Sequence, residues 1–176
     1  SQIEAGTRPL RVAWRGGEGP FQITLWRANA ALPLATHDNV VENQATLDET
    51  DLKPGTYQIR VKDSANRHQE GNFTVVDSSD LPPLPTELEN YQEEDPPKPL
   101  LEAAWLATQE GGKFVFEAYQ RVSRLASMNP EANQMKERLR VQNAIRILQR
   151  KRQSGSKFSP GSEDEVESVS LRCVNC

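Results

Sequence analysis

The sequence predicts an α+β protein: a small antiparallel β-sandwich, then a helical hairpin or three-helix unit, and a disordered C-terminal tail. Between residues 10 and 77 apolar side chains alternate with polar ones, which is the period of half-buried strands. Beyond residue 99 the apolar spacing changes to three and four residues, the period of helices. After residue 153 the chain is rich in Ser, Gly and charge, a composition that forms no packed core.

These changes divide the chain into four predicted segments. They are a sandwich over residues 8–77, a Pro-rich linker over 78–98, a helical domain over 99–152 and a disordered tail over 153–176. The linker prolines cannot donate backbone hydrogen bonds, so this segment is expected to lack regular structure. A short helix over 86–91, with Thr86 as its N-cap, is the exception that we expect within it.

The segment 52–63 is the most informative stretch of the predicted sandwich. Pro54 and Gly55 form a turn signal, and Tyr57 then opens a strictly alternating strand. The spacing Leu-x-x-Gly-x-Tyr that starts at Leu52 is that of a tyrosine corner, in which the phenol hydroxyl bonds back to upstream backbone. Other strands are expected at 10–14, 21–27, 44–47 and 71–77, with an edge segment and loops over 28–43.

These elements together resemble a fibronectin type III or related immunoglobulin-like domain over residues 8–77. The resemblance rests on strand 10–14, a Gly- and Pro-containing loop, strand 21–27 and the tyrosine corner. It implies a core and corner formed by Trp14, Leu47, Leu52, Gly55 and Tyr57. The segment is short, and a first strand before Leu10 is barely visible, so a minimal version of the fold is expected.

Two apolar stripes predict an antiparallel helical hairpin after the linker. The first spans residues 100–107 and ends at 111–112, and the second spans 114–126 and ends at 128–130. Their order is similar to that of a single tetratricopeptide-type repeat. A third helix is expected from Pro130 to about Arg152.

Composition limits the classes of function. The 176 residues carry a net charge of −4, which is too mild to indicate nucleic acid or an acidic ligand. The two cysteines, Cys173 and Cys176, are expected to be free thiols, and no apolar run is long enough to span a bilayer. The start at Ser1 without an initiator Met suggests a processed or excised fragment, and an extracytoplasmic setting is favoured for a module of this kind.

No group of residues has the pattern of a catalytic or metal site. His37 and His68 fall in separate segments that are expected to be solvated loops. No Ser occupies a nucleophile elbow, and no Gly-rich loop precedes a helix in the manner of a phosphate-binding loop. We therefore expect no enzymatic activity, no cofactor, no metal and no small-molecule substrate.

Two candidate partner-binding surfaces remain. Trp26 is out of phase with the inward residues of strand 21–27, so it is expected on the outer face, where it is either covered by the helices or anchors a partner. The basic helix 131–152, with Arg146, Arg150 and Arg152, lacks aromatic residues for base stacking. A solvated charged face is therefore favoured over nucleic-acid binding.

The leading hypothesis is a non-enzymatic protein–protein interaction module within a larger bacterial envelope-associated or regulatory protein. An alternative is a protease-controlled or signalling fragment, in which the linker 78–98 or the loop 128–130 is cut or switched. A second alternative is nucleic-acid binding through helix 131–152, which would show a steep dependence on salt.

Overall fold

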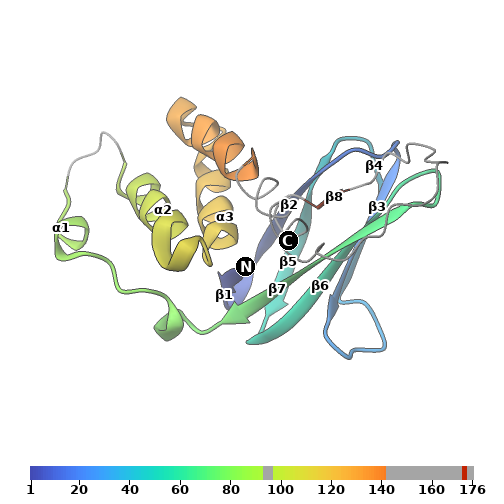
Figure 1. Cartoon of the computed structure of the whole chain (residues 1–176), viewed down its shortest axis with the longest axis horizontal. Helices are drawn as coiled ribbons and strands as arrows, with labels where there is room; N and C mark the ends of the chain where they lie inside the picture. Colours follow the sequence, from blue (N-terminus) through green and yellow to red (C-terminus); the bar gives the residue numbers. More distant parts are fainter. Residues whose placement is uncertain (93–96, 142–171, 174–176) are drawn as a thin grey trace, which may run out of the picture.

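The computed structural model describes residues 1–92, 97–141 and 172–173 (Figure 1). The chain is an α+β protein. Its strands are β1 (Gln2–Glu4), β2 (Gly6–Arg15), β3 (Phe21–Arg27), β4 (Ala35–Val40), β5 (Gln44–Leu52), β6 (Gly55–Lys62), β7 (His68–Val76) and β8 (Arg172–Cys173). Its helices are η1 (Ser78–Asp80), α1 (Thr86–Glu89), α2 (Lys98–Thr108), η2 (Gln109–Gly111) and α3 (Val115–Leu125), followed by a helix whose described part covers 130–141.

The strands form two sheets. One has the order β1-β7-β6-β3-β4 and the other the order β5-β2-β8. Most neighbours are antiparallel, but β1 runs parallel to β7, with Ile3 opposite Val75. The first sheet is therefore mixed, and the prediction of a purely antiparallel arrangement is wrong at β1. We refer to residues 2–76 as the β-unit.

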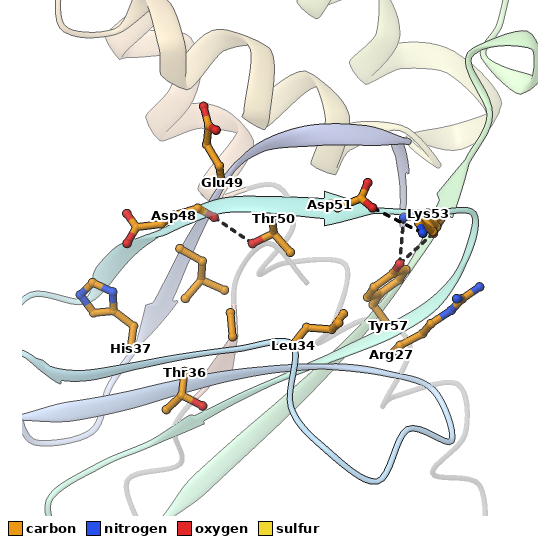
Figure 2. A pocket seen from close by; sticks show the side chains of 12 residues that line it. Arg27, Leu34, Thr36, His37, Asp48, Glu49, Thr50, Asp51, Lys53 and Tyr57 are labelled. Atoms are coloured by element: carbon orange, nitrogen blue, oxygen red, sulfur yellow. Dashed lines mark hydrogen bonds and ion pairs between the residues drawn. The ribbon is translucent and has the colours of Figure 1, made fainter.

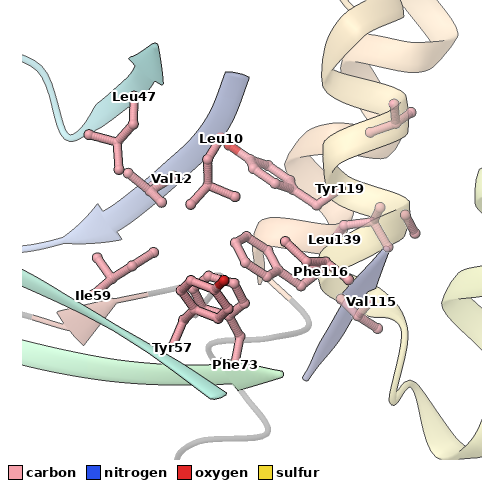
Figure 3. Packing of buried hydrophobic residues seen from close by; sticks show 14 of the residues in the cluster. Leu10, Val12, Leu47, Tyr57, Ile59, Phe73, Val115, Phe116, Tyr119 and Leu139 are labelled. Carbon is pink, nitrogen blue, oxygen red and sulfur yellow. The ribbon is translucent and has the colours of Figure 1, made fainter. Parts of the chain in front are cut away.

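The two sheets face each other across an apolar core. In Figure 3, Leu10, Val12 and Leu47 of the smaller sheet lie opposite Tyr57, Ile59 and Phe73 of the larger one. These side chains alternate along their strands with polar residues, so each strand presents one apolar face to the core. The largest fully buried side chains of the β-unit are Trp14, Tyr57 and Phe73. Trp14 meets Phe21 edge-on at 5.1 Å, and Tyr57 stacks on Phe73 at 5.4 Å.

The turn before β6 is held by the tyrosine hydroxyl. Tyr57 Oη donates to the carbonyl oxygen of Lys53 (2.8 Å) and accepts from the backbone N–H of Lys53 (3.0 Å). Gly55 has a φ of 146°, a conformation that favours glycine because other residues have a Cβ. Arg27 donates from Nη2 to the carbonyl oxygen of Pro54 (2.9 Å) and closes the turn from the other side.

The edge strands β4 and β5, which lie on the same side of the β-unit, each contain a bulge. In β5 the register with β2 shifts between the pairs Arg8–Thr50 and Leu10–Leu47, so β5 has one extra residue there. The residue opposite this bulge is Pro9, which has no N–H to donate to a regular ladder. In β4 the shift includes Asn39, which has a φ of 58°.

The sequence predicted only an edge segment and loops over 28–43, but residues 35–40 form the continuous strand β4. Val40 is its one buried residue, which explains why the apolar pattern was faint. His37 lies inside β4, and His68 is the first residue of β7, so the assignment of both to loops is wrong. Both side chains are exposed, as expected.

The helices after the linker form one unit that packs on the β-unit. Helices α2 and α3 contact each other, and α3 also contacts β1 and β2. Asn129 caps the next helix, since its Oδ1 accepts from the N–H of Ala132 (2.8 Å). In the linker, Thr86 is the first residue of α1, Pro85 stands at the cap position and no side chain caps this helix, so the expected Thr86 cap is wrong. We refer to residues 98–141 as the helical unit.

A part of the predicted disordered tail is a strand. Residues 172–173 form β8, which pairs antiparallel with Trp14 and Arg15 of β2. The prediction of disorder is therefore wrong for these two residues. The remaining residues of 153–176, Cys176 among them, lie outside the described residues.

Candidate functional site

The two sheets leave two lateral sides at which the core could be exposed. One lies between β1 and the part of β2 that has no pairing with β8, and the other lies between β4 and β5. Helix α3 covers the first side (Figure 3). Phe116 of α3 is fully buried and meets Phe73 edge-on at 5.2 Å, which extends the aromatic cluster of the β-unit into the helical unit.

A buried ion network joins α3 to the first two strands. Glu117 is fully buried, and Arg8 donates to its two carboxylate oxygens. The N–H of Glu4 donates to Glu117 Oε2 (3.0 Å), and Arg121 Nε donates to Glu117 Oε1 (2.8 Å). Arg121 also pairs with Glu4 (3.1 Å) and Glu102 (3.5 Å). The network therefore contains five charged residues from four secondary-structure elements.

The electrostatics of this network favour its charged form. Burial alone would raise the pKa of Glu117, but the hydrogen bonds and charge of Arg8, with those of Arg121 and Glu4 N–H, hold its pKa below the ordinary value. Burial would lower the pKa of Arg121, but Glu117, Glu4 and Glu102 hold it above the ordinary value. Because each charge has a partner, we assign the network to docking of the helical unit.

The second lateral side forms a cleft of about 470 Å³ between β4 and β5 (Figure 2). β4 and β5 are the last strands of their sheets on this side, so the outer edge of each has no strand neighbour within the described chain. Leu47 and Tyr57 form the inner wall, and Leu34 and Ala35 stand at the start of β4. The cleft therefore combines an apolar wall with two open strand edges.

The rim of the cleft carries three carboxylates and two cations, Arg27 and Lys53. Asp48, Glu49 and Asp51 of β5 line it, and Figure 2 shows Glu49 pointing away from the cleft and Thr50 pointing into it. Asp51 pairs with Lys53 at 3.6 Å, whereas Asp48 and Glu49 have no ion-pair partner among the described residues. The Thr50 hydroxyl donates to the carbonyl oxygen of Asp48 (2.8 Å), so this carbonyl oxygen of β5 already has a hydrogen-bond partner. Asp48 is thus the rim carboxylate that remains for a cationic ligand group.

An exposed apolar loop leads into the cleft. The β3–β4 loop (residues 28–34) reads Ala-Asn-Ala-Ala-Leu-Pro-Leu, and every residue in it is exposed. Leu32 is 77% exposed, and Leu34, which also lines the cleft, is 47% exposed. Apolar side chains grouped in this way at a cleft are typical of an interaction surface.

Trp26 lies on the outer face of the larger sheet, as the alternation predicts. It is half-buried, and the guanidinium of Arg60 lies 5.1 Å from its ring centroid. Arg60 in turn pairs with Glu70 of the neighbouring strand. The described part of the helical unit packs along β1 and β2 instead, so among the described residues Trp26 is covered by Arg60 and not by a helix. Partner binding by Trp26 stays a prediction.

The structure places the other sequence-derived candidates as follows. Trp14, Leu47, Leu52 and Tyr57 are all buried in the core between the sheets, and Gly55 is the first residue of β6. Arg146, Arg150 and Arg152 lie outside the described residues, so nucleic-acid binding through them stays a prediction. The cleft itself was not predicted, because only the sheet topology brings β4 and β5 together.

Two general features follow from the described part of the chain. Among residues 1–92, 97–141 and 172–173, no three His, Cys, Asp or Glu side chains are grouped so as to hold a metal ion. Within the same residues, none of the helices has the length and apolar character to cross a membrane.

Comparison with known proteins does not assign the chain to a family. No protein-family model matches the sequence, and a comparison with curated proteins finds no relative. Among solved structures, the chain is similar to the crystal structure of CopC from Methylosinus trichosporium OB3b. The identity is 22% and the TM-score is 0.33, over 47% of this chain and 88% of that one. At this TM-score the likeness carries no functional argument.

Proposed function

We propose that the chain is a non-enzymatic protein–protein interaction module, and that the cleft between β4 and β5 binds an extended segment of a partner protein. The observation that carries the proposal is the exposed apolar β3–β4 loop at the mouth of the cleft, with Leu32 77% exposed. Exposing such a loop to water is unfavourable, and a bound partner would remove the apolar area from solvent.

The chemistry of the partner follows from the lining of the cleft. An apolar side chain of the partner would pack on Leu34, Leu47 and Tyr57. A Lys or Arg beside it would meet Asp48, which has no cationic partner among the described residues. The outer edge of β4 supplies main-chain groups for strand addition, although the bulge at Asn39 limits pairing to its first half.

We further propose that the β-unit is an immunoglobulin-like sandwich. The two hydrogen bonds of the Tyr57 hydroxyl to Lys53 support this, because they are those expected at a tyrosine corner. Burial of Trp14, Leu47 and Leu52 between the sheets supports it as well. In this architecture, loops at the ends of the sheets carry binding residues on a rigid support.

Selection from a library of seven-residue peptides displayed on phage tests the proposed function. We expect enriched peptides to share one large apolar residue flanked by Lys or Arg, and to lose binding to the Leu32→Asp and Leu34→Asp variants. Val41→Asp is the matched control, because Val41 is 81% exposed but does not line the cleft. Peptides that bind wild type and both loop variants equally, or turnover of a substrate by the pure protein, would contradict the proposal.

A further inference from the structure

A second hollow lies where the helical unit meets the outer face of the smaller sheet. Its volume is about 320 Å³, and β2, β5, α3 and the helix over 130–141 all contribute to it. Its lining contains the cations Arg11 and Lys136 and the hydroxyls of Thr46 and Ser123. Its one carboxylate, that of Glu42, accepts a hydrogen bond from the amide of Gln44 (2.8 Å).

Arg11 is fixed at this hollow without a carboxylate partner. Its backbone N–H and C=O both bond to the side chain of Gln120, at 2.9 and 2.7 Å, so its position on β2 is set. Its guanidinium has no ion pair among the described residues, and Nη1 is buried there without a hydrogen-bond partner. Burial lowers the pKa of Arg11, and the positive charge of Arg124 lowers it further, while Tyr119 opposes this effect. The Arg11 side chain is partly buried. A partly buried guanidinium beside a second cation is unfavourable unless an anion compensates.

The helical unit contributes further donors to the hollow. Ser123 Oγ is buried and has no hydrogen-bond partner in the described chain. The nearest carboxylate to Lys136 Nζ is that of Glu137, 3.7 Å away on the same helix. Buried polar atoms without partners are rare in folded proteins, and a bound ion or water is one common explanation.

We propose that this hollow binds a small phosphate-type oxyanion between the β-unit and the helical unit. The guanidinium of Arg11 offers paired N–H groups that match two oxygens of a tetrahedral anion. Lys136 adds a second positive charge, and Ser123 of α3 adds a hydroxyl donor. The donor set fits inorganic phosphate.

The proposal has a mechanical consequence. Arg11 belongs to β2, whereas Ser123 and Lys136 belong to α3 and to the following helix. An anion that bonds to all three would link the two units. A ligand that binds only the assembled form stabilises it in proportion to the logarithm of its concentration.

Thermal unfolding of the full chain with inorganic phosphate tests the inference, with ionic strength held constant by sodium chloride. We expect the midpoint to rise by about 5–10 °C at 100 times the dissociation constant. Calorimetric titration should show that Arg11→Gln raises this constant about tenfold or more. Ser123→Ala and Lys136→Gln should weaken binding too, and they test the site independently if Arg11→Gln fails to fold.

Arg138→Gln is the matched control, because Arg138 is exposed on the same helix as Lys136 and does not line the hollow. It removes the same charge and should leave the phosphate effect unchanged. A midpoint that does not respond to phosphate would mean that only water fills the hollow, and would overturn the inference. A response that is equal in wild type, Arg11→Gln and Lys136→Gln would overturn it as well.

Discussion

The side-chain amide of Gln120 in α3 replaces a neighbouring strand for Arg11 in β2. Gln120 Oε1 accepts from the backbone N–H of Arg11 (2.9 Å), and Gln120 Nε2 donates to its carbonyl oxygen (2.7 Å). β2 would otherwise present these two groups to the apolar interface with α3. One buried glutamine thus satisfies the edge of a sheet and fixes the position of the helix along it.

Replacement of Gln120 by Leu is expected to destabilise the protein by about 2–4 kcal/mol. The variant leaves one donor and one acceptor of Arg11 without partners, and each such loss costs about 1–3 kcal/mol. Urea unfolding measures the change. The control is Gln134→Leu on the exposed face of the last described helix, which should cost less than about 0.5 kcal/mol. Equal stability of the two variants would show that the amide has no role in docking.

Replacement of Glu117 by Gln is expected to cost about 3–5 kcal/mol, because it leaves Arg8 buried without its charge partner. The double variant Arg8→Met, Glu117→Leu should regain most of this loss, since it removes both charges and keeps apolar volume. Glu110→Gln breaks the exposed pair with Lys113 and serves as the control, with an expected change below about 1 kcal/mol. Urea unfolding of wild type and these three variants decides whether the network acts as a unit.

Stability should decrease on acidification because of the same carboxylate. The pKa of Glu117 is held below its ordinary value of 4.5 in the folded protein. Its contribution is therefore fully present above about pH 4.5 and is lost as the pH falls through the lower native pKa. The measurement is the difference in unfolding free energy between wild type and Glu117→Gln from about pH 7 to about pH 3. We expect this difference to shrink on acidification; a constant difference would assign the cost of the variant to shape alone.

The central strands could be predicted from the sequence because each buries a whole face. In β3 and β6, Ile23, Leu25, Ile59 and Val61 alternate with polar residues, and this pattern identifies both strands without tertiary information. β1 and β4 each bury a single side chain, Ile3 and Val40. Pairing with β7 and β3 creates these two strands, and pairing is not visible in local periodicity.

The sequence also did not predict the buried polar contacts of Glu117 and Gln120 in α3, and the reason is different. A helix with one apolar stripe is expected to place Glu and Gln in water. In α3, however, every residue from Val115 to Gln120 is buried, because β1 and β2 cover the side that α2 leaves open. The sequence does contain one indication of this burial, which is the angular width of the apolar face of the helix. Phe114, Phe116, Tyr119 and Val122 extend over more than one face, which indicates a helix buried on several sides.

Replacement of Tyr57 by Phe is expected to destabilise the β-unit by about 1–3 kcal/mol without changing its fold. The ring would keep its stacking on Phe73, whereas the N–H and C=O of Lys53 would lose the hydroxyl that bonds to both. Urea unfolding gives the magnitude, and hydrogen exchange should show faster exchange at the Lys53 amide. In the control, Lys53→Ala removes an exposed side chain and keeps both backbone bonds, so it should change stability by less than about 0.5 kcal/mol. If Tyr57→Phe were as stable as wild type, the hydroxyl would not hold the turn, and the strongest support for an immunoglobulin-like corner would be lost.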